Sequence, residues 1–320
     1  MRPVIGTFEN SHVFPAPTDA LSLRDRCLSR RTFALGLVCS FVTVRLCAQQ
    51  MPRRIVSTAP SITEALFALG LGDLVVGVSR YCDYPPQVAK LPKVGSYVKP
   101  DLEGIVRLAP DIVVLQTASA DLKDRLKALH IAFVEVPHGS LEDVFTGIQM
   151  IAASAGVQDR AEKLVGQIRG SLQSIQAKGR TMPSPRVIAI LNRKQGTLAD
   201  LTAVGPGNYV NQILEITGAT NVLAKSGLPH YPHISLETVL RENPDVILDL
   251  SDMQDTEAMR QAERPAALSL WRQNKSLKAI QSGHVFFGTS NALSVPGPRA
   301  PEAAEMLFEF MHGDGAGGQS

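Results

Sequence analysis

The sequence predicts an α/β protein of two similar lobes with mostly parallel sheets, joined by one long helix, with a ligand cleft between the lobes. Three observations lead to this prediction: a stretch that occurs twice, an alternation of strand-like and helix-like segments around each copy, and one long amphipathic segment between them. At 320 residues the chain is long enough for two domains with substantial cores.

The repeated stretch occupies residues 101–115 and 235–249. Five pairs of positions are identical: Leu102 and Leu236, Glu103 and Glu237, Arg107 and Arg241, Pro110 and Pro244, Asp111 and Asp245. In each copy a capping residue, Asp101 or Ser235, opens a short helix with a glutamate in its first turn. The proline ends that helix, and the β-branched run after it is typical of a strand buried on both faces. Two such units indicate two similar lobes.

Around the first copy, residues 53–156 alternate between strand and helix patterns, which favours a parallel sheet covered by helices. Ser61 and Glu64 have the spacing of a capping box at the start of the first helix. We expect strands at residues 54–57, 74–78, 112–115 and 132–136, and helices at residues 62–71, 122–129 and 141–155.

Residues 157–180 carry one apolar stripe at helical spacing and predict the connecting helix. Its stretch from Asp159 to about Lys178 spans roughly 30 Å at about 1.5 Å per residue. The second lobe, residues 184–312, contains the second copy of the repeat. The glycine-rich tail at residues 313–320 is expected to be disordered. In the second lobe we also expect strands at residues 186–191 and 285–287, and helices at residues 208–217, 271–279 and 302–312.

Residues 1–48 are expected to be an export signal with a long n-region. The sequence SRRTFAL at residues 29–35 matches the S-R-R-x-F-x-L pattern of a twin-arginine signal, and a short apolar run follows it. A membrane span needs about 20 apolar residues, which favours a signal that is cleaved after Ala48. A buried amphipathic helix is the alternative. Lipid attachment at Cys47 is disfavoured, because Leu46 is large where such sites carry a small residue.

Composition and motifs exclude several classes of protein. The formal charge is only +2, whereas nucleic-acid-binding proteins carry a clustered excess of basic residues. Three of the four cysteines lie in the signal, so Cys82 has no partner for a disulfide within the mature chain. Phosphate-binding glycine loops, the H-E-x-x-H pattern and G-x-S-x-G are missing, and we therefore predict a protein that is not an enzyme.

His230 and His233 are the one close histidine pair, and the prolines around them place the pair in a loop. The loop lacks the helical geometry of zinc peptidases, so ordinary loop histidines are favoured over a metal site. A metal-dependent enzyme of two α/β lobes stays open as an alternative function, and no resident metal or cofactor is expected.

All five tyrosines fall in predicted loops or at a helix start. Loops at the carboxyl ends of parallel strands form the crevice where α/β proteins bind ligands, and tyrosine offers a flat apolar ring with a polar tip. We therefore predict Tyr81, Tyr84, Tyr97 and Tyr231 as ligand-binding residues. Tyr97 and Tyr231 precede the two repeat copies and are expected to face each other across the cleft. The alternative is that exposed tyrosines simply prefer loop edges.

Glu103 and Glu237 support a second hypothesis. Taken singly, each is a first-turn glutamate that the helix dipole favours. As a symmetric pair, one on each lobe, they are suited to dock on a two-fold symmetric partner through arginine side chains.

Several short stretches of the sequence match a known family as a set. They are residues 55–66, 76–78, 82–86, 94–96, 102–106, 110–114 and 296–299. With them the chain resembles the periplasmic substrate-binding proteins of ABC importers for cobalamin, ferric siderophores and haem, in which a single long helix joins the lobes. The resemblance extends from Arg53 to His312 and is closest to the cobalamin-binding branch, mainly through Asp83, Tyr84 and the two prolines that follow.

The resemblance implies roles for particular residues. Glu103 and Glu237 occupy the places of the family's two glutamates that pair with arginines of the permease. Tyr97 and Tyr231 occupy places where cobalamin binders stack aromatic rings, often tryptophans, on the corrin. A ferric siderophore would instead be met by tyrosine and arginine, for which Arg80, Arg193 and Arg299 are candidates, and we include Arg299 among the ligand-binding residues. The stretch at residues 116–118 carries no aromatic residue.

We therefore expect a periplasmic, monomeric binding component of an ABC importer, which captures cobalamin or a related corrinoid and delivers it to an inner-membrane permease. A haem-binding protein with a tyrosine or histidine axial ligand, or a ferric-siderophore-binding protein, is the alternative within the same fold. The rigid connecting helix predicts a small closure on ligand binding rather than a wide hinge.

Overall fold

A computed structural model describes residues 51–116, 120–225, 227–251, 257–288 and 290–312, with the side chains of residues 120 and 257–262 excluded. The predicted export signal, the predicted disordered tail and most of the stretch at residues 116–118 lie outside these residues. Gln49–Ser320 forms one compact unit. The lobe limits of 53–156 and 184–312 therefore stay a prediction.

The first sheet is wholly parallel, with strand order β2-β1-β3-β4. Its central strands are short apolar runs buried on both faces, as the sequence indicates. The four strands are β1 (Ile55–Ser57), β2 (Val75–Val78), β3 (Ile112–Gln116) and β4 (Ala132–Val136).

Four helices belong to this sheet: α1 (Pro60–Ala68), α2 (Leu102–Arg107), α3 (Ala120–Ala128) and α4 (Leu141–Ala155). Ser140 and Asp143 form a capping box at the start of α4, and Gly156 ends it with φ 69°. The capping box predicted for Ser61 and Glu64 is wrong. Ala59 is the N-cap of α1 without a side-chain bond, and Glu64 is buried.

The second sheet is mixed, with strand order β10-β9-β5-β6-β8 and β7 paired to β5. Strands β10, β9, β5 and β7 run parallel, whereas β6 and β8 are antiparallel to their neighbours. The sequence did not indicate β6, β7 or β8, because pairs and triplets of residues carry no measurable periodicity. The strands are β5 (Arg186–Asn192), β6 (Leu201–Ala203), β7 (Thr220–Asn221), β8 (His233–Ile234), β9 (Val246–Asp249) and β10 (Val285–Phe287).

The helices of this half are α6 (Tyr209–Ile216), α7 (Leu236–Glu242), α8 (Glu257–Arg272), α9 (Lys278–Gln281) and α10 (Ala300–His312). The helix predicted at residues 271–279 is wrong. Helix α8 ends at Arg272, Leu277 is extended, and α9 starts only at Lys278. Pro265 lies inside α8 and masks it in the sequence, because an internal proline is typical of a helix end.

The two repeat copies adopt the same local structure. The Asp111 carboxylate accepts the Arg54 backbone N–H at 3.0 Å, and the Asp245 carboxylate accepts the Arg186 backbone N–H at 3.0 Å. Each aspartate therefore joins the start of its own strand, β3 or β9, to the start of the neighbouring strand, β1 or β5. The repeated aspartates fix the register of the two central strand pairs.

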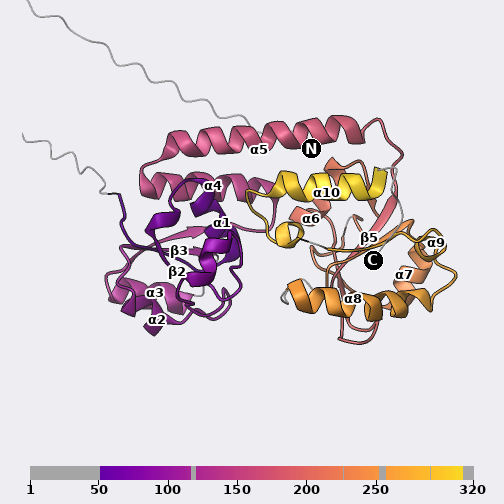
Figure 1. Ribbon diagram of the computed structural model, residues 1–320, viewed down its shortest axis with the longest axis horizontal. Helices are drawn as coiled ribbons and strands as arrows, with labels where there is room; N and C mark the ends of the chain where they lie inside the picture. The colour runs from indigo at the N-terminus through magenta and orange to yellow at the C-terminus, as the bar shows by residue number, and fades with distance from the viewer. Residues whose placement is uncertain (1–50, 117–119, 226, 252–256, 289, 313–320) are drawn as a thin grey trace, which may run out of the picture. The chain divides into compact units, whose positions relative to one another are not determined.

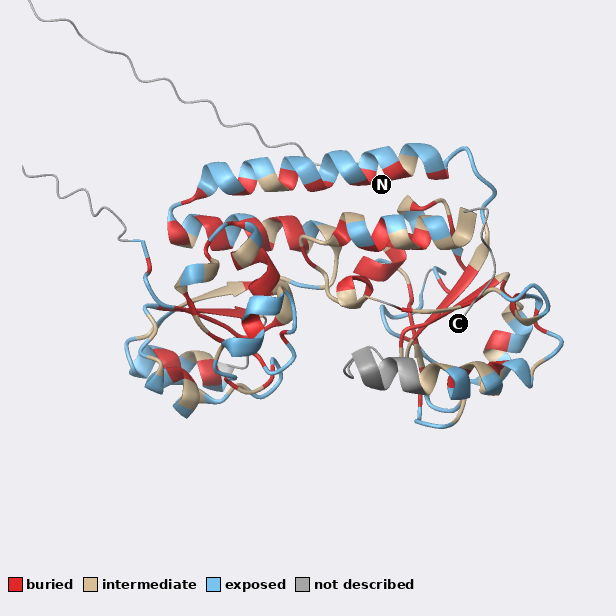
Figure 2. Cartoon of the chain, viewed as in Figure 1, coloured by how far each residue is buried: buried red, intermediate tan, exposed pale blue. Residues whose placement is uncertain are grey.

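The helix expected to connect the lobes is α5 (Gln158–Gly179), which packs along α4, α6 and α10 (Figure 1). One face is buried through Ala161, Val165, Ile168, Leu172 and Ile175, and the opposite face is exposed (Figure 2). At Gly179 a Cβ atom would lie 2.7 Å from the Thr217 carbonyl carbon, so only glycine permits this close approach to the end of α6.

One hydrophobic core cluster runs from the first sheet through α4 and α5 to α6 and α10, which joins the two halves of the chain. Smaller clusters fill the α2–α3 face of the first sheet and the interior of the second sheet. Among the described residues no helix combines the length and hydropathy that crossing a membrane requires.

Candidate functional site

Two loops of the first sheet carry three of the predicted ligand-binding tyrosines. Residues 79–86 follow the carboxyl end of β2, and the Arg80 backbone N–H donates to the Gly95 carbonyl of the second loop at 2.8 Å. In that second loop, Ser96 and Lys99 close a tight turn, because the Ser96 N–H donates to the Lys99 carbonyl and the Lys99 N–H donates to the Ser96 Oγ. Tyr97 therefore lies at the tip of the turn.

The rings of Tyr81 and Tyr97 are in contact, with centroids 5.8 Å apart and planes tilted by 54°. The Arg80 guanidinium lies 5.1 Å from the centroid of the Tyr81 ring. These residues form what we call the tyrosine patch. The two tyrosines are 37% and 47% exposed, which leaves their ring surface available to a ligand.

Tyr84 lies at a different contact, over the side chain of Arg299. The Arg299 guanidinium carbon is 4.0 Å from the centroid of the Tyr84 ring, a cation–π distance. The same guanidinium donates to both Glu64 carboxylate oxygens, at 2.9 Å and 2.5 Å, and to Asn291 Oδ1 at 2.5 Å. Burial raises the pKa of the Glu64 carboxyl, and the hydrogen bonds and charge of Arg299 oppose that rise.

Tyr231 is the predicted ligand residue of the second half, and its ring is 48% exposed. The loop before it is held by Asn208 Nδ2, which donates to the His230 carbonyl at 2.7 Å, and by the Gly205 N–H, which donates to the same carbonyl at 2.9 Å. Partial burial raises the pKa of the Tyr231 hydroxyl, so this phenol is neutral at physiological pH.

His230 and His233 each contact the protein itself. His230 Nδ1 lies 2.7 Å from the Pro206 carbonyl oxygen, and His233 Nδ1 lies 3.3 Å from Thr202 Oγ1. His233 begins β8 rather than lying in a loop. In the part of the chain that the structure describes, no three histidine, cysteine, aspartate or glutamate side chains come together as a metal site would need.

Tyr209, the fifth tyrosine, does not follow the pattern predicted for the others. It is fully buried at the start of α6, and its hydroxyl donates to the Ala292 carbonyl at 3.1 Å. Burial raises its pKa strongly. A helix start in the sequence therefore did not mean an exposed ring, because Tyr209 fills the core where α6 meets the segment before α10.

Glu103 and Glu237 are both exposed in the first turns of matching helices. Asp101 caps the first helix through the Gly104 N–H at 3.1 Å, whereas Ser235 stands at the second N-cap without a side-chain bond. Asp101 and Ser235 are thus both N-caps, as predicted, although only Asp101 forms a side-chain hydrogen bond there.

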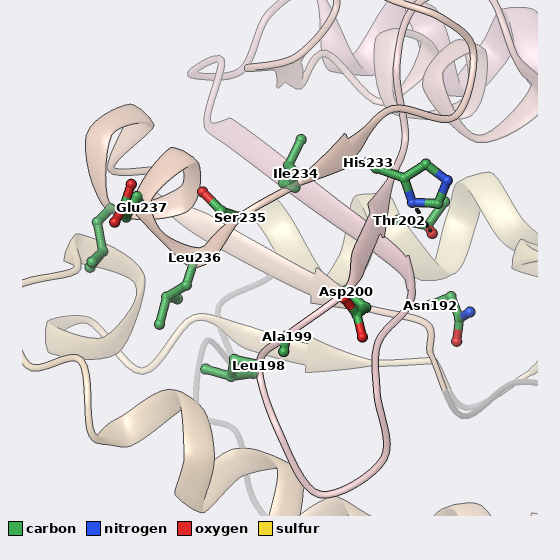
Figure 3. Close-up of a pocket in the computed structure, with 11 residues that line it drawn as sticks. Asn192, Leu198, Ala199, Asp200, Thr202, His233, Ile234, Ser235, Leu236 and Glu237 are labelled. Carbon is green, nitrogen blue, oxygen red and sulfur yellow. Dashed lines mark hydrogen bonds between the residues drawn. The ribbon is translucent and has the colours of Figure 1, made fainter.

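An open hollow of about 940 Å³ lies beside Glu237. Figure 3 shows Leu198 and Leu236 on one side and His233 against Thr202 on the other. The lining residues with a formal charge are Asp200 and Glu237, both acidic. Such a surface offers apolar contact and negative charge to a partner.

Arg193 and Asp249, buried at the carboxyl ends of β5 and β9, form an ion pair at 3.2 Å. Arg193 was a candidate to meet a ferric siderophore, and its side chain is 3% exposed, held within the protein. Sequence reasoning missed Asp249, Asn291 and the role of Glu64. The available signal was Glu64 itself, because a carboxylate amid the apolar residues of a helix needs a cation from elsewhere in the chain.

The fold and the site define the class of this protein. A parallel sheet and a mixed sheet share a core along one long helix, and exposed tyrosines lie on loops at strand ends. The chain matches the model of the periplasmic binding protein family over residues 55–292, and it belongs to that family.

Individual relatives and solved structures are similar to this chain over most of its length. The chain is 28% identical over 259 residues to the vitamin B12-binding protein of Vibrio parahaemolyticus serotype O3:K6 (strain RIMD 2210633), covering 80% of this chain and 88% of that protein. Two solved structures are each 24% identical and show the same fold. The periplasmic vitamin B12 binding protein BtuF of Vibrio cholerae has a TM-score of 0.67, with 81% of this chain and 96% of that chain covered. The apo periplasmic heme-binding protein RhuT from Roseiflexus sp. RS-1 has a TM-score of 0.69, with 80% and 96% covered.

Proposed function

We propose that this protein is the periplasmic solute-binding component of an ABC importer and that it captures cobalamin or a related corrinoid. Membership of the periplasmic binding protein family supports the binding role, and the vitamin B12-binding relative supports the corrinoid. In this proposal the protein acts as a monomeric carrier rather than a catalyst, and cobalamin is its cargo.

The observation that carries the proposal is the tyrosine patch. Two tyrosine rings in mutual contact and partly exposed form a flat apolar surface with polar tips, which suits a large, flat, partly polar ligand such as a corrin. Tyr231 offers a third exposed ring from the second half of the chain, and we place the corrin between it and the patch.

The alternative ligand is haem, whose iron can be bound axially by a tyrosine oxygen. It is favoured by the same exposed phenols, although the raised pKa of Tyr231 disfavours its phenolate before metal binding. A ferric siderophore has less support. Two of the three arginines predicted to meet it, Arg193 and Arg299, already hold carboxylates in buried or nearly buried ion pairs. The third, Arg80, is exposed, and its guanidinium lies over the Tyr81 ring.

The partner in this proposal is an inner-membrane ABC permease. Exposed Glu103 and Glu237 would each receive an arginine of the permease, and the hollow beside Glu237 adds apolar contact and a second acid, Asp200. Because α5 and its shared core run through both halves, we expect a small closure when ligand binds.

Calorimetric titration of the purified protein with cyanocobalamin tests the ligand. One-to-one binding at micromolar strength or tighter supports the corrinoid. A parallel titration with haemin, followed by its Soret band, tests the alternative. A protein that gives neither heat nor a thermal shift with cyanocobalamin but a Soret shift with haemin would reassign the ligand within the same fold.

A further inference from the structure

The segment of residues 290–299, between β10 and α10, contacts the 79–86 loop of the first sheet at two neighbouring residues. Asn291 Nδ2 donates to the Asp83 carboxylate at 2.5 Å, across 208 positions of sequence. Next to it, the Arg299 guanidinium carbon lies 4.0 Å from the centroid of the Tyr84 ring. Two consecutive residues of a loop that carries two predicted ligand tyrosines are therefore held by the far end of the chain.

The Arg299 side chain is itself fixed by an ion pair and hydrogen bonds. It forms a two-pronged ion pair with Glu64 of α1, and the two side chains are 11% and 2% exposed. Its remaining donors contact Asn291 Oδ1 at 2.5 Å and Ser290 Oγ at 3.3 Å. The guanidinium thus has a fixed plane, which is the plane that Tyr84 covers.

The segment is also seated by its backbone. Pro296, Gly297 and Pro298 lie against residues of α1 and α4, and a Cβ atom at Gly297 would come within 3.2 Å of a Glu64 carboxylate oxygen. Tyr209 binds the Ala292 carbonyl from the other side. The segment is consequently held by contacts with α1, α4 and α6.

We propose that Arg299, Glu64 and Asn291 are positioning residues that hold Asp83 and Tyr84, so that the 79–86 loop presents Tyr81 and Tyr84 in one orientation before ligand arrives. They act on binding through the loop, without touching the ligand. This role replaces direct contact of Arg299 with a ligand, because its donors are already directed at Glu64, Asn291 and Ser290. The effect on ligand affinity rests on the proposed function, whereas the effect on loop order does not.

Exchanging the amide of Asn291 with the carboxylate of Asp83 tests the contact directly. Asn291→Asp places a second carboxylate against Asp83 and still offers an acceptor to Arg299. Asp83→Asn combined with Asn291→Asp restores the hydrogen bond with donor and acceptor exchanged. Amide hydrogen exchange of the peptide spanning residues 79–86, measured without ligand, is the first readout. We expect about tenfold faster exchange in the single variant and wild-type exchange in the double variant, since a bond of ~1.4 kcal/mol corresponds to tenfold.

The second readout is affinity for cyanocobalamin, and for haemin in parallel. We expect about tenfold weaker binding in Asn291→Asp and recovery in the double variant, as preorganisation of the loop is lost and regained. Arg299→Lys keeps the charge without the fork, and we expect it to raise loop exchange and weaken binding as well. Glu162→Gln, at an exposed position on α5 with no role in binding or docking, is the control and should change neither readout.

Two results would overturn the proposal. Loop exchange that is unchanged in Asn291→Asp would show that the segment does not order the loop. A double variant that regains loop order but not affinity would show that Asn291 or Asp83 contacts the ligand itself. A wild-type protein that binds neither compound would refute the proposed ligands, while loop exchange in the same variants would still decide the positioning role.

Discussion

Arg193 and Asp249 form an ion pair at 3.2 Å although their side chains are only 3% and 0% exposed. Asp249 also accepts the indole N–H of Trp271 at 2.8 Å and the Ser251 backbone N–H at 3.1 Å. These donors bring together the ends of β5, β9 and α8. The carboxylate is compensated by several donors, which is the condition under which a buried charge is tolerated.

Asp249→Ala is therefore expected to destabilise the protein by about 3–5 kcal/mol, because it leaves the Arg193 charge and the Trp271 N–H buried without this carboxylate. Urea-induced unfolding, followed by the fluorescence of the single tryptophan, measures the loss. Glu103→Gln is a surface control and should stay within about 0.5 kcal/mol of wild type. A loss below about 1 kcal/mol for Asp249→Ala would show that the pair contributes little.

The raised pKa of the buried Cys82 thiol predicts that the stability of the protein depends on pH. Burial raises the pKa of this thiol from the ordinary value of 9.0 to about 11, with Thr63 and Lys93 opposing part of the rise. A folded-state pKa above the unfolded value means that the thiol's contribution is complete below pH 9 and is lost as the pH rises through 11. The total is about 2–3 kcal/mol, at 1.36 kcal/mol per unit.

The measurement compares wild type with Cys82→Ala, which removes the titrating group while other residues titrate equally in both. The difference in unfolding free energy should shrink steadily between pH 9 and about pH 11 in favour of the alanine variant, a window set by the unfolded and folded pKa values of the thiol. A difference that stays constant over this range would mean that the folded thiol ionises normally.

Gly95 is expected to be essential for the position of Tyr97. Its φ of 83° is a left-handed conformation, and a Cβ there would lie 2.6 Å from the Asp101 backbone nitrogen. Gly95→Ala should cost about 1–3 kcal/mol and displace the Ser96–Lys99 turn. Thermal unfolding measures the cost. Gly196→Ala is the matched control, because Gly196 has φ 70° but no heavy atom near its Cβ position. Its loss of stability therefore reflects backbone strain alone.

Substitutions of Tyr97 and Tyr231 distinguish stacking from metal ligation. If the rings stack on a corrin, Tyr→Phe keeps the ring and should change affinity for cyanocobalamin by less than about threefold, whereas Tyr→Ala should weaken it about tenfold for each ring. If one of them ligates haem iron, its Phe variant should lose the Soret shift seen with haemin, since the oxygen ligand is gone. Equal losses for Phe and Ala in the cyanocobalamin titration would contradict stacking.

The sequence predicted well those features that repeat or have a long period. The repeat is confirmed down to Asp111 and Asp245, because each aspartate binds a backbone N–H that any copy of the unit must satisfy. Helix α4 has the predicted limits, and α5 differs by a residue at each end, since 15 and 22 residues give a clear 3.6-residue period. Tyr81 and Tyr97 lie together, although the sequence did not indicate that their rings touch.

Tertiary context decided the rest. Glu64 has capping-box spacing but pairs with Arg299, which lies 235 positions away, and no local pattern encodes such a pair. Tyr209 resembles the other tyrosines in sequence and is buried only because α6 packs against the segment before α10. Strands β6 and β8 are too short for a period and exist through pairing with β5 and each other.

Docking on a permease gives the last prediction. Glu103 and Glu237 are exposed and lie in matching helices, so reversing both charges removes attraction to arginines without disturbing the core. We expect Glu103→Arg with Glu237→Arg to abolish uptake of labelled cyanocobalamin by cells that depend on this protein, while affinity of the purified variant stays within about twofold of wild type. Arg107→Glu with Arg241→Glu, the next identical pair of the repeat, is the matched control of exposed charges in the same helices. Normal uptake by Glu103→Arg with Glu237→Arg would place the docking contact elsewhere on the surface. An equal loss of uptake in the control, Arg107→Glu with Arg241→Glu, would do the same.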